Sequence, residues 1–173
     1  GWEKESLVLL DPASREVTKP FDVDPSNTAI ELDPTGQYLV ALGETASVYE
    51  VRSGKLLDSI DLTGDTAAAA FTEDGKNLVL LDTYLEDAES GGQFVTNTQG
   101  KVLIAETTTG SIIHSVQAQG GPTSVIVEGD SAYVAQRWPV HMAVAECGIY
   151  RCSLSGCRID CHPSSGEAGI HIE

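Results

Sequence analysis

Short apolar runs, separated by residues that favour turns, recur along the chain. The pattern is clearest between Thr28 and Leu62. Four apolar runs occur there, separated by short segments in which glycine or proline favours a turn. The second run is apolar at successive positions, which is typical of a strand covered on both faces. We therefore predict four short antiparallel strands. They cover Thr28–Leu32, Gln37–Leu42, Ala46–Val51 and Lys55–Leu62.

The pattern of this stretch returns at a fixed spacing. The turn glycine Gly36 has a counterpart at Gly75, 39 residues later, and a weaker one at Gly129. A second landmark, an acidic residue four positions before a turn glycine, occurs at Glu50 and again at Glu106. Repeats of about 40 residues, each with four short antiparallel strands, indicate the blades of an all-β protein, a β-propeller.

Two stretches are longer than the repeat requires. The polar stretch 83–99 lies between the second and third strands of its blade, and a shorter excess falls around 137–146. Additions at the rim of a propeller leave the core of the blades unchanged. We expect the first of these insertions to be a solvated, mobile loop.

This pattern predicts a single β-propeller domain or a fragment of one. We expect three complete antiparallel four-stranded blades with part-blades at both ends, in a partial or four-bladed propeller. The wheel could close through the last strand joining the first two, through two copies joining as half-wheels, or through blades of a longer protein. The expected segments are the part-blade 1–23, the blades 28–62, 66–118 (with the insertion 83–99) and 122–161, and the first strand of a further blade at 167–173.

Several strand ends resemble those of a known family. The segment Val48–Lys55 looks like the Trp-Asp segment that ends the third strand of a WD40 blade, with Tyr49-Glu50 in place of that dipeptide. The turns Asp33–Leu39 and Thr72–Leu78 are similar to the turn shared by WD40, YVTN-type and TolB-like propellers. No blade has a Gly-His pair or a literal Trp-Asp, so the resemblance is to WD40/YVTN-like propellers in the broad sense. It implies a scaffold for partners more often than an enzyme, although lactonases, dehydrogenases and peptidases also contain such propellers.

Charge narrows the range of partners. The 173 residues include 26 acidic and 10 basic ones, which gives a formal net charge of −16. A surface of this sign repels nucleic-acid phosphates and anionic membranes, so we expect neither as a partner. No apolar run is long enough to span a bilayer, and no signal peptide is visible. We expect a protein or peptide partner, with a homodimer or complementation by further blades as the other arrangements.

The cysteines are grouped near the end of the chain. They are Cys147, Cys152, Cys157 and Cys161. Their spacing differs from the close pairs that are usual in structural zinc sites. If Ser153–Gly156 is a four-residue turn, the middle two cysteines face each other across a ladder and the outer two lie near each other, at separations that suit disulfides. Two disulfides, one disulfide with free thiols, a metal site and reduced cysteines are all open. Pairing would favour an extracytoplasmic or secreted protein, and the segment Ile149–Cys157 also resembles a hairpin of actinobacterial propeller-like proteins.

Two segments are candidate contact surfaces. The insertion 83–99 carries aromatic residues among carboxylates, as exposed binding loops often do. Calcium is an alternative ligand there, but the segment lacks the alternating spacing and the closing glutamate of an EF-hand loop, so we favour a solvated loop. Around 137–142 a cation, aromatics and an imidazole occur together, and we favour a cover for the blade edge over a ligand pocket. The candidate partner-binding residues are Tyr84, Glu86, Asp87, Phe94, Arg137, Trp138 and His141.

Candidate catalytic residues are scarce. None of the histidines, of which His114 is expected at the surface of an outer strand, has metal-ligand spacing, and the sequence contains no G-x-S-x-G motif. We expect a non-catalytic binding scaffold with no catalytic residues, no metal and no cofactor. The alternative is a fragment of a lactonase- or hydrolase-type propeller. Its channel-facing segments, 24–27, 63–65 and 119–121, supply carboxylates but no repeated set of His, Arg or Glu.

Overall fold

The computed structural model describes residues 6–10, 13–23, 29–90, 93–118, 120–137 and 147–153. Every regular element within these ranges is a strand. The strands are β1 (Ser6–Leu10), β2 (Val17–Asp22), β3 (Ala29–Leu32), β4 (Tyr38–Leu42), β5 (Thr45–Glu50), β6 (Lys55–Asp61), β7 (Asp65–Phe71), β8 (Asn77–Ser90), β9 (Gln93–Glu106), β10 (Ile112–Ala118), β11 (Gly121–Glu128), β12 (Ser131–Arg137) and β13 (Cys147–Ser153).

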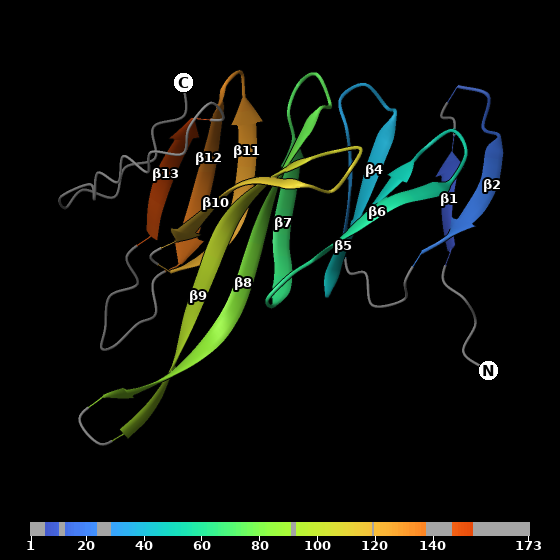
Figure 1. The fold of residues 1–173 in the computed structure, drawn as a ribbon. Coiled ribbons are helices and arrows are strands. Elements are labelled where there is room, and N and C mark those ends of the chain that lie inside the picture. The colour runs from blue at the N-terminus through green and yellow to red at the C-terminus, as the bar shows by residue number, and fades with distance from the viewer. Residues whose placement is uncertain are drawn as a thin grey trace, which may run out of the picture.

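The strands form four antiparallel sheets that lie side by side in a row (Figure 1). The sheets are β1–β2, β3–β6, β7–β10 and β11–β13, and within each one the strands follow chain order. Four antiparallel strands in chain order are the blade of a propeller, so the predicted fold class is confirmed. In the described part of the chain, β1–β2 and β11–β13 lie at opposite ends of the row and do not close a ring (Figure 1). The end of the predicted blade 122–161, from residue 154 onward, and the predicted strand at 167–173 lie outside the described residues.

The repeated turns share one backbone geometry. Gly36, Gly75 and Gly129 have positive φ angles of 71°, 68° and 53°, a region that residues with a Cβ rarely adopt. In the first two turns the glycine N–H donates to the carbonyl of Asp33 or Thr72, at 2.9 and 2.8 Å. The glycines of the sequence repeat therefore occupy the same left-handed conformation in three blades.

The acidic landmark of the repeat has a structural cause as well. The carboxylate of Glu106 accepts a hydrogen bond from the hydroxyl of Thr109 at 2.7 Å. The carboxylate of Glu50 accepts the equivalent bond from Ser53 at 2.5 Å. In both blades, the acidic residue closes the turn between the third and fourth strands.

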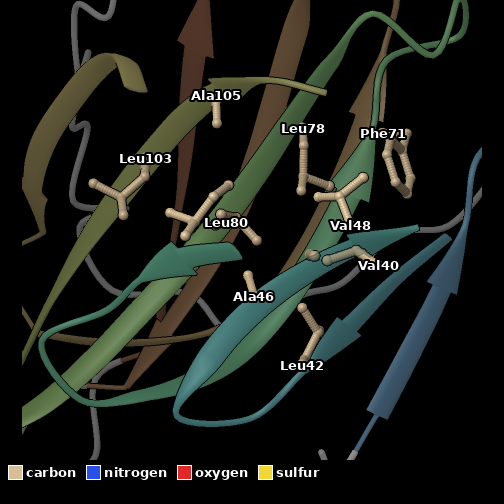
Figure 2. Packing of buried hydrophobic residues seen from close by; sticks show 11 residues of the cluster. Val40, Leu42, Ala46, Val48, Phe71, Leu78, Leu80, Leu103 and Ala105 are labelled. Carbon is tan, nitrogen blue, oxygen red and sulfur yellow. The ribbon is translucent and has the colours of Figure 1, made fainter. Parts of the chain in front are cut away.

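Apolar side chains from both faces of the two central blades form the core. Val40 and Leu42 of β4 pack toward the third sheet, whereas Leu39 and Ala41 pack toward the first, as the unbroken apolar run predicts. All four are at most 3% exposed. Figure 2 shows the first pair, with Val48 beside it, facing residues of the third sheet.

The second strand of the third sheet follows the same rule. Leu78 and Leu80 face the second sheet, and Val79 and Leu81 face the fourth. All four side chains are completely buried. Because each central blade is apolar on both faces, it stabilises two interfaces at once.

Strands β8 and β9 are much longer than the others. They pair without a bulge from Asn77↔Glu106 to Ser90↔Gln93. Residues 83–90 and 93–99, expected to belong to a solvated, mobile loop, are therefore parts of two paired strands, and the prediction of a loop is wrong for them. A hairpin satisfies backbone hydrogen-bonding groups that such a loop would leave to water, which accounts for the regular structure.

The outer half of this hairpin projects beyond its sheet. The neighbouring strands reach only to Thr83 on β8 and to Gly100 on β9. The residues past these points, Tyr84–Ser90 and Gln93–Gln99, form a two-stranded extension that we call the arm (Figure 1). The arm lies between the second and third strands of its blade, where the insertion was predicted.

Candidate partner-binding site

A group of polar side chains surrounds the base of the arm. Lys101 Nζ lies 5.4 Å from the centre of the Tyr84 ring and donates to the hydroxyl of Thr63 at 3.2 Å. The side-chain nitrogen of Gln117 donates to the Tyr84 hydroxyl and to the Gly100 carbonyl, each at 3.0 Å. A cation above an exposed aromatic ring contributes about 0.5–1 kcal/mol. These contacts connect Tyr84 of the arm, and the β9 residues just below the arm, to the loop at Thr63 and to β10.

Asp82 of β8 pairs with Lys101 across the ladder and is almost completely buried, at 1% exposure. Its carboxylate accepts hydrogen bonds from the backbone N–H groups of Thr63, at 3.0 and 3.2 Å, and of Gly64, at 2.9 Å. A buried carboxylate needs such donors to replace its hydration. Because Thr63 and Gly64 connect β6 to β7, Asp82 holds the segment by which the chain passes from the second sheet to the third.

The backbone approaches closely on both sides of the arm's base. A Cβ at Gly64 would lie 2.2 Å from the carbonyl oxygen of Thr83, and a Cβ at Gly100 would lie 2.1 Å from Cδ of Pro122. The Thr83 hydroxyl also donates to the Pro122 carbonyl at 3.0 Å. The base is therefore tightly packed between the segments that lead into β7 and β11.

Four of the predicted contact residues lie on the arm. Tyr84 is half-buried at its base, Glu86 and Asp87 belong to β8, and Phe94 belongs to β9. Leu85, which was not among the candidates, is 72% exposed. The hairpin register brings these residues together on a single projecting element, which was predicted from the sequence to be a loop.

The remaining candidates are separate from the arm or outside the described residues. Arg137 ends β12 in the fourth sheet, in register with Cys147, whereas Trp138 and His141 lie outside the described ranges. Cys147 and Cys152 belong to β13. Cys157 and Cys161 also lie outside those ranges, so the disulfide pairing stays a prediction.

A groove of about 430 Å³ runs along the first strands of three sheets, β3, β7 and β11. Most of the described residues that line it have apolar side chains, and Glu31 is the only ionisable one among them. Of the channel-facing segments, 24–27 lies outside the described residues, and Thr63 and Gly64 are bound to Asp82. Among the described residues that line the groove, no acid is brought together with a base.

Other candidate chemistry is limited in the described ranges. His114 is half-buried on the outer strand β10. No group of three or more His, Cys, Asp or Glu side chains within those ranges is arranged to hold a metal ion. The same residues include no helix that could cross a membrane.

Four residues at the base of the arm were not among the predicted contact residues. They are Thr63, Asp82, Lys101 and Gln117. One signal was present: Asp82 directly follows the buried run Leu78–Leu81, at the place where the preceding repeat has a glycine. A charge at the end of a strand that is buried on both faces requires hydrogen-bond donors nearby. The other three residues carried no local signal, because their partners come from other strands.

Comparison with solved structures supports the propeller fold. The chain matches the β-propeller domain of the Trilobed protease from Pyrococcus furiosus with a TM-score of 0.58 and 11% sequence identity, over 86% of this chain and 46% of that one. It matches Pyrococcus horikoshii acylaminoacyl peptidase with a TM-score of 0.67 and 11% identity, over 94% of this chain and 28% of that one. These likenesses confirm the β-propeller architecture that the repeat predicted.

Sequence comparison is less specific. No protein-family model matches the chain. A curated relative, U3 small nucleolar RNA-associated protein 13 of Saccharomyces cerevisiae, is 24% identical over 125 residues, which are 69% of this chain and 13% of that protein. The chain thus spans less than half the length of each of these proteins.

Proposed function

We propose that this β-propeller chain is a non-catalytic scaffold that binds a protein or peptide partner through its rim, with the arm as the principal contact surface. The observation that carries the proposal is the arm itself. Seven residue pairs of a regular ladder, from Tyr84↔Gln99 to Ser90↔Gln93, extend past the sheet.

The base of the arm supports this function. A projecting hairpin binds well only if it is already held in one orientation, because ordering it on binding would cost affinity. The contacts among Tyr84, Lys101 and Gln117, and the close approach of Gly100 to Pro122, supply that order before any partner arrives.

The shape of the arm favours a protein partner over a small molecule. A pocket for a small ligand is concave and encloses its ligand, whereas the arm is a convex, two-stranded ribbon. The groove along β3, β7 and β11 is the place to look for the alternative, an enzymatic propeller. With Glu31 as the only ionisable residue of its lining, the groove lends that alternative little support.

The test is removal of the arm with the sheet left intact. Deleting 85–90 and 93–98 joins Tyr84 to Gln99 through the Gly91-Gly92 pair, which preserves the register of β8 and β9. Proteins retained by the full chain and by this variant would be compared by quantitative mass spectrometry. Each difference would then be remeasured with purified components by calorimetry.

The control is Ile30→Ser, which changes a residue of β3 that is 52% exposed and leaves the arm unchanged. We expect partner binding to be lost in the arm deletion and kept in the control. Equal binding by the full chain and the arm deletion would contradict the proposal.

A further inference from the structure

We propose that the outer edge of β9 in the arm, at Phe94 and Thr96, accepts an extended basic segment of the partner as an additional β-strand. This inference rests on the proposed function and specifies the mode of binding. Strand addition of this kind uses main-chain hydrogen bonds for affinity and side chains for selectivity.

The hydrogen-bonding phase of the hairpin identifies the free positions. The N–H of Thr107 donates to the carbonyl of Lys76 at 2.9 Å, so these residues form a hydrogen-bonded pair of the antiparallel ladder. The register from there to Ser90↔Gln93 has no bulge, and hydrogen-bonded and non-hydrogen-bonded pairs alternate along it. Even-numbered residues of β9 therefore direct their backbone N–H and C=O groups away from β8. In the arm, these residues are Phe94, Thr96 and Thr98.

Among the described residues, a strand pairs with this edge at its base and none pairs with it further out. On β9, pairing with β10 stops at Gly100, whose carbonyl also accepts a hydrogen bond from Gln117. At the next outward-directed position, the side chain of Thr98 packs against β11, since a Cβ at Gly121 would lie only 2.5 Å from its Cγ2. Beyond Thr98, no strand within the described ranges pairs with this side of β9. Phe94 and Thr96 are thus two successive open rungs of the ladder.

The two edges of the arm differ in sequence. From Gln93 to Gln99, β9 carries no charge and is rich in β-branched, aromatic and amide side chains, a composition suited to strand pairing. The outward-directed positions of β8 include Asp87 and Glu89, and charged residues on an edge oppose pairing. The acidic edge is therefore protected, and the uncharged one is available.

Charge indicates the chemistry of the incoming strand. Glu86, Asp87 and Glu89 lie on β8, and the sequence between Thr83 and Gly100 contains no lysine or arginine. A strand added to β9 would lie two strand spacings, about 10 Å, from β8, within the screening length of about 10 Å at 0.1 M salt. Lysine or arginine side chains on that strand would be attracted, and acidic ones repelled.

A proline substitution provides a selective test. Thr96→Pro removes an outward-directed N–H from β9 while keeping the hydrogen bonds between β8 and β9, because proline is tolerated at such an edge position. Leu85→Pro is the matched control, since it removes an outward-directed N–H from β8 and leaves the charge unchanged. The probe is a fluorescent peptide of alternating threonine and lysine, titrated against the full chain and both variants by anisotropy. Circular dichroism would verify that the variants are folded.

We expect the lysine peptide to bind the full chain and Leu85→Pro alike, with affinity falling as salt rises. Thr96→Pro should bind about tenfold more weakly, since one main-chain hydrogen bond and the rung around it are lost. A peptide with glutamate in place of lysine, or one methylated at its backbone nitrogens, should not bind.

Three results would overturn the inference: equal affinity of Thr96→Pro and the full chain, equal affinity for the lysine and glutamate peptides, or a doubled mass of the chain alone that Thr96→Pro abolishes. The last would mean that a second copy occupies the edge. The arm deletion separates this inference from the proposed function. If partner binding is lost in the deletion and kept in Thr96→Pro, the arm binds the partner without strand addition.

Discussion

The second and third sheets have the same four-strand plan, and they differ at equivalent positions that are buried or partly buried. At the start of the repeated turn, the second sheet has Asp33 and the third has Thr72. At the end of the second strand, Gly43 in one sheet corresponds to Asp82 in the other. After the third strand, Val51 corresponds to Thr107, and the N–H of each makes the same 2.9 Å bond to the preceding hairpin.

The difference shows how one backbone accommodates different polar groups. Asp33 accepts hydrogen bonds within its own turn, from the N–H groups of Thr35 at 3.0 Å and Tyr38 at 2.6 Å and from the Thr35 hydroxyl. Asp82 instead accepts bonds from the segment that connects two sheets. The second sheet is therefore stabilised at a turn, and the third at its junction with its neighbour, where the arm begins.

Among the variants that test how the two sheets are stabilised, we expect the largest loss of stability from a substitution in the core that they share. Leu80→Ala removes a completely buried side chain between the two sheets, and such truncations cost about 2–5 kcal/mol. We expect a loss of this size in the free energy of unfolding, measured by urea denaturation of the full chain. Leu85→Ala, on the exposed part of the same strand, is the control and should change stability by less than about 0.5 kcal/mol. Similar losses in the two variants would mean that the interface of the sheets contributes little.

Removing the junction carboxylate should have the next largest effect. Asp82→Ala leaves the N–H groups of Thr63 and Gly64 without their acceptor, which we expect to cost about 2–3 kcal/mol. Asp82→Asn keeps one acceptor oxygen and should lose less. Hydrogen exchange at the two amides would check the cause, because their protection should fall in the alanine variant. Unchanged protection there would contradict the role assigned to Asp82.

The turn of the second sheet should respond to pH. Burial raises the pKa of Asp33, but the hydrogen bonds from Thr35, Tyr38 and Gln37 together outweigh burial and hold it below its ordinary value. The stabilisation is therefore complete above about pH 4, the ordinary value for aspartate, and is lost as the pH falls through the lower pKa of the folded protein. Asp33→Asn should cost about 1–2 kcal/mol at pH 7 and progressively less in acid. Urea denaturation at several pH values would measure this.

The equivalent turn of the third sheet supplies the control for that experiment. There the carboxylate belongs to Asp74, which lies at the surface, 2.8 Å from Lys76 Nζ. Hydrogen bonds from Lys76 and Thr72 lower the pKa of Asp74 to about 2. Because solvent screens this pair, Asp74→Asn should change stability less than Asp33→Asn does. A larger loss of stability in Asp74→Asn than in Asp33→Asn would contradict the conclusion that the buried carboxylate contributes more to its turn.

The smallest expected effect has the opposite sign. The hydroxyl of Thr107 is completely buried, and within the described ranges it has no hydrogen-bond partner. Thr107→Val introduces the residue that the second sheet has at this position and removes the unsatisfied hydroxyl. We expect stability to rise by about 1 kcal/mol, measured as a higher urea midpoint at unchanged slope. A loss of stability would mean that the hydroxyl is satisfied in solution, and Thr107→Ser would then lose little.

The repeat unit could be predicted because its signals are local. Gly36, Gly75 and Gly129 each adopt a left-handed conformation within a turn of a few residues. The apolar run from Leu39 to Leu42 indicates that both faces of its strand are covered. The candidate site could be predicted only in part. Tyr84, Glu86, Asp87 and Phe94 were identified as a contact region, but as part of a loop, because polar residues between two strands resemble an insertion as much as a continued hairpin.

By itself, the sequence determined the strand pattern, the turn positions and the place where the blade is extended, since each depends on residues adjacent in the chain. The tertiary structure decided that the extension continues the ladder as an arm, and that Asp82 supports the segment at Thr63 and Gly64. It also decided which edge of β9 stays open. These features depend on where strands from different parts of the chain end relative to one another, and a hydrogen bond between residues 19 positions apart leaves no periodic trace in the sequence.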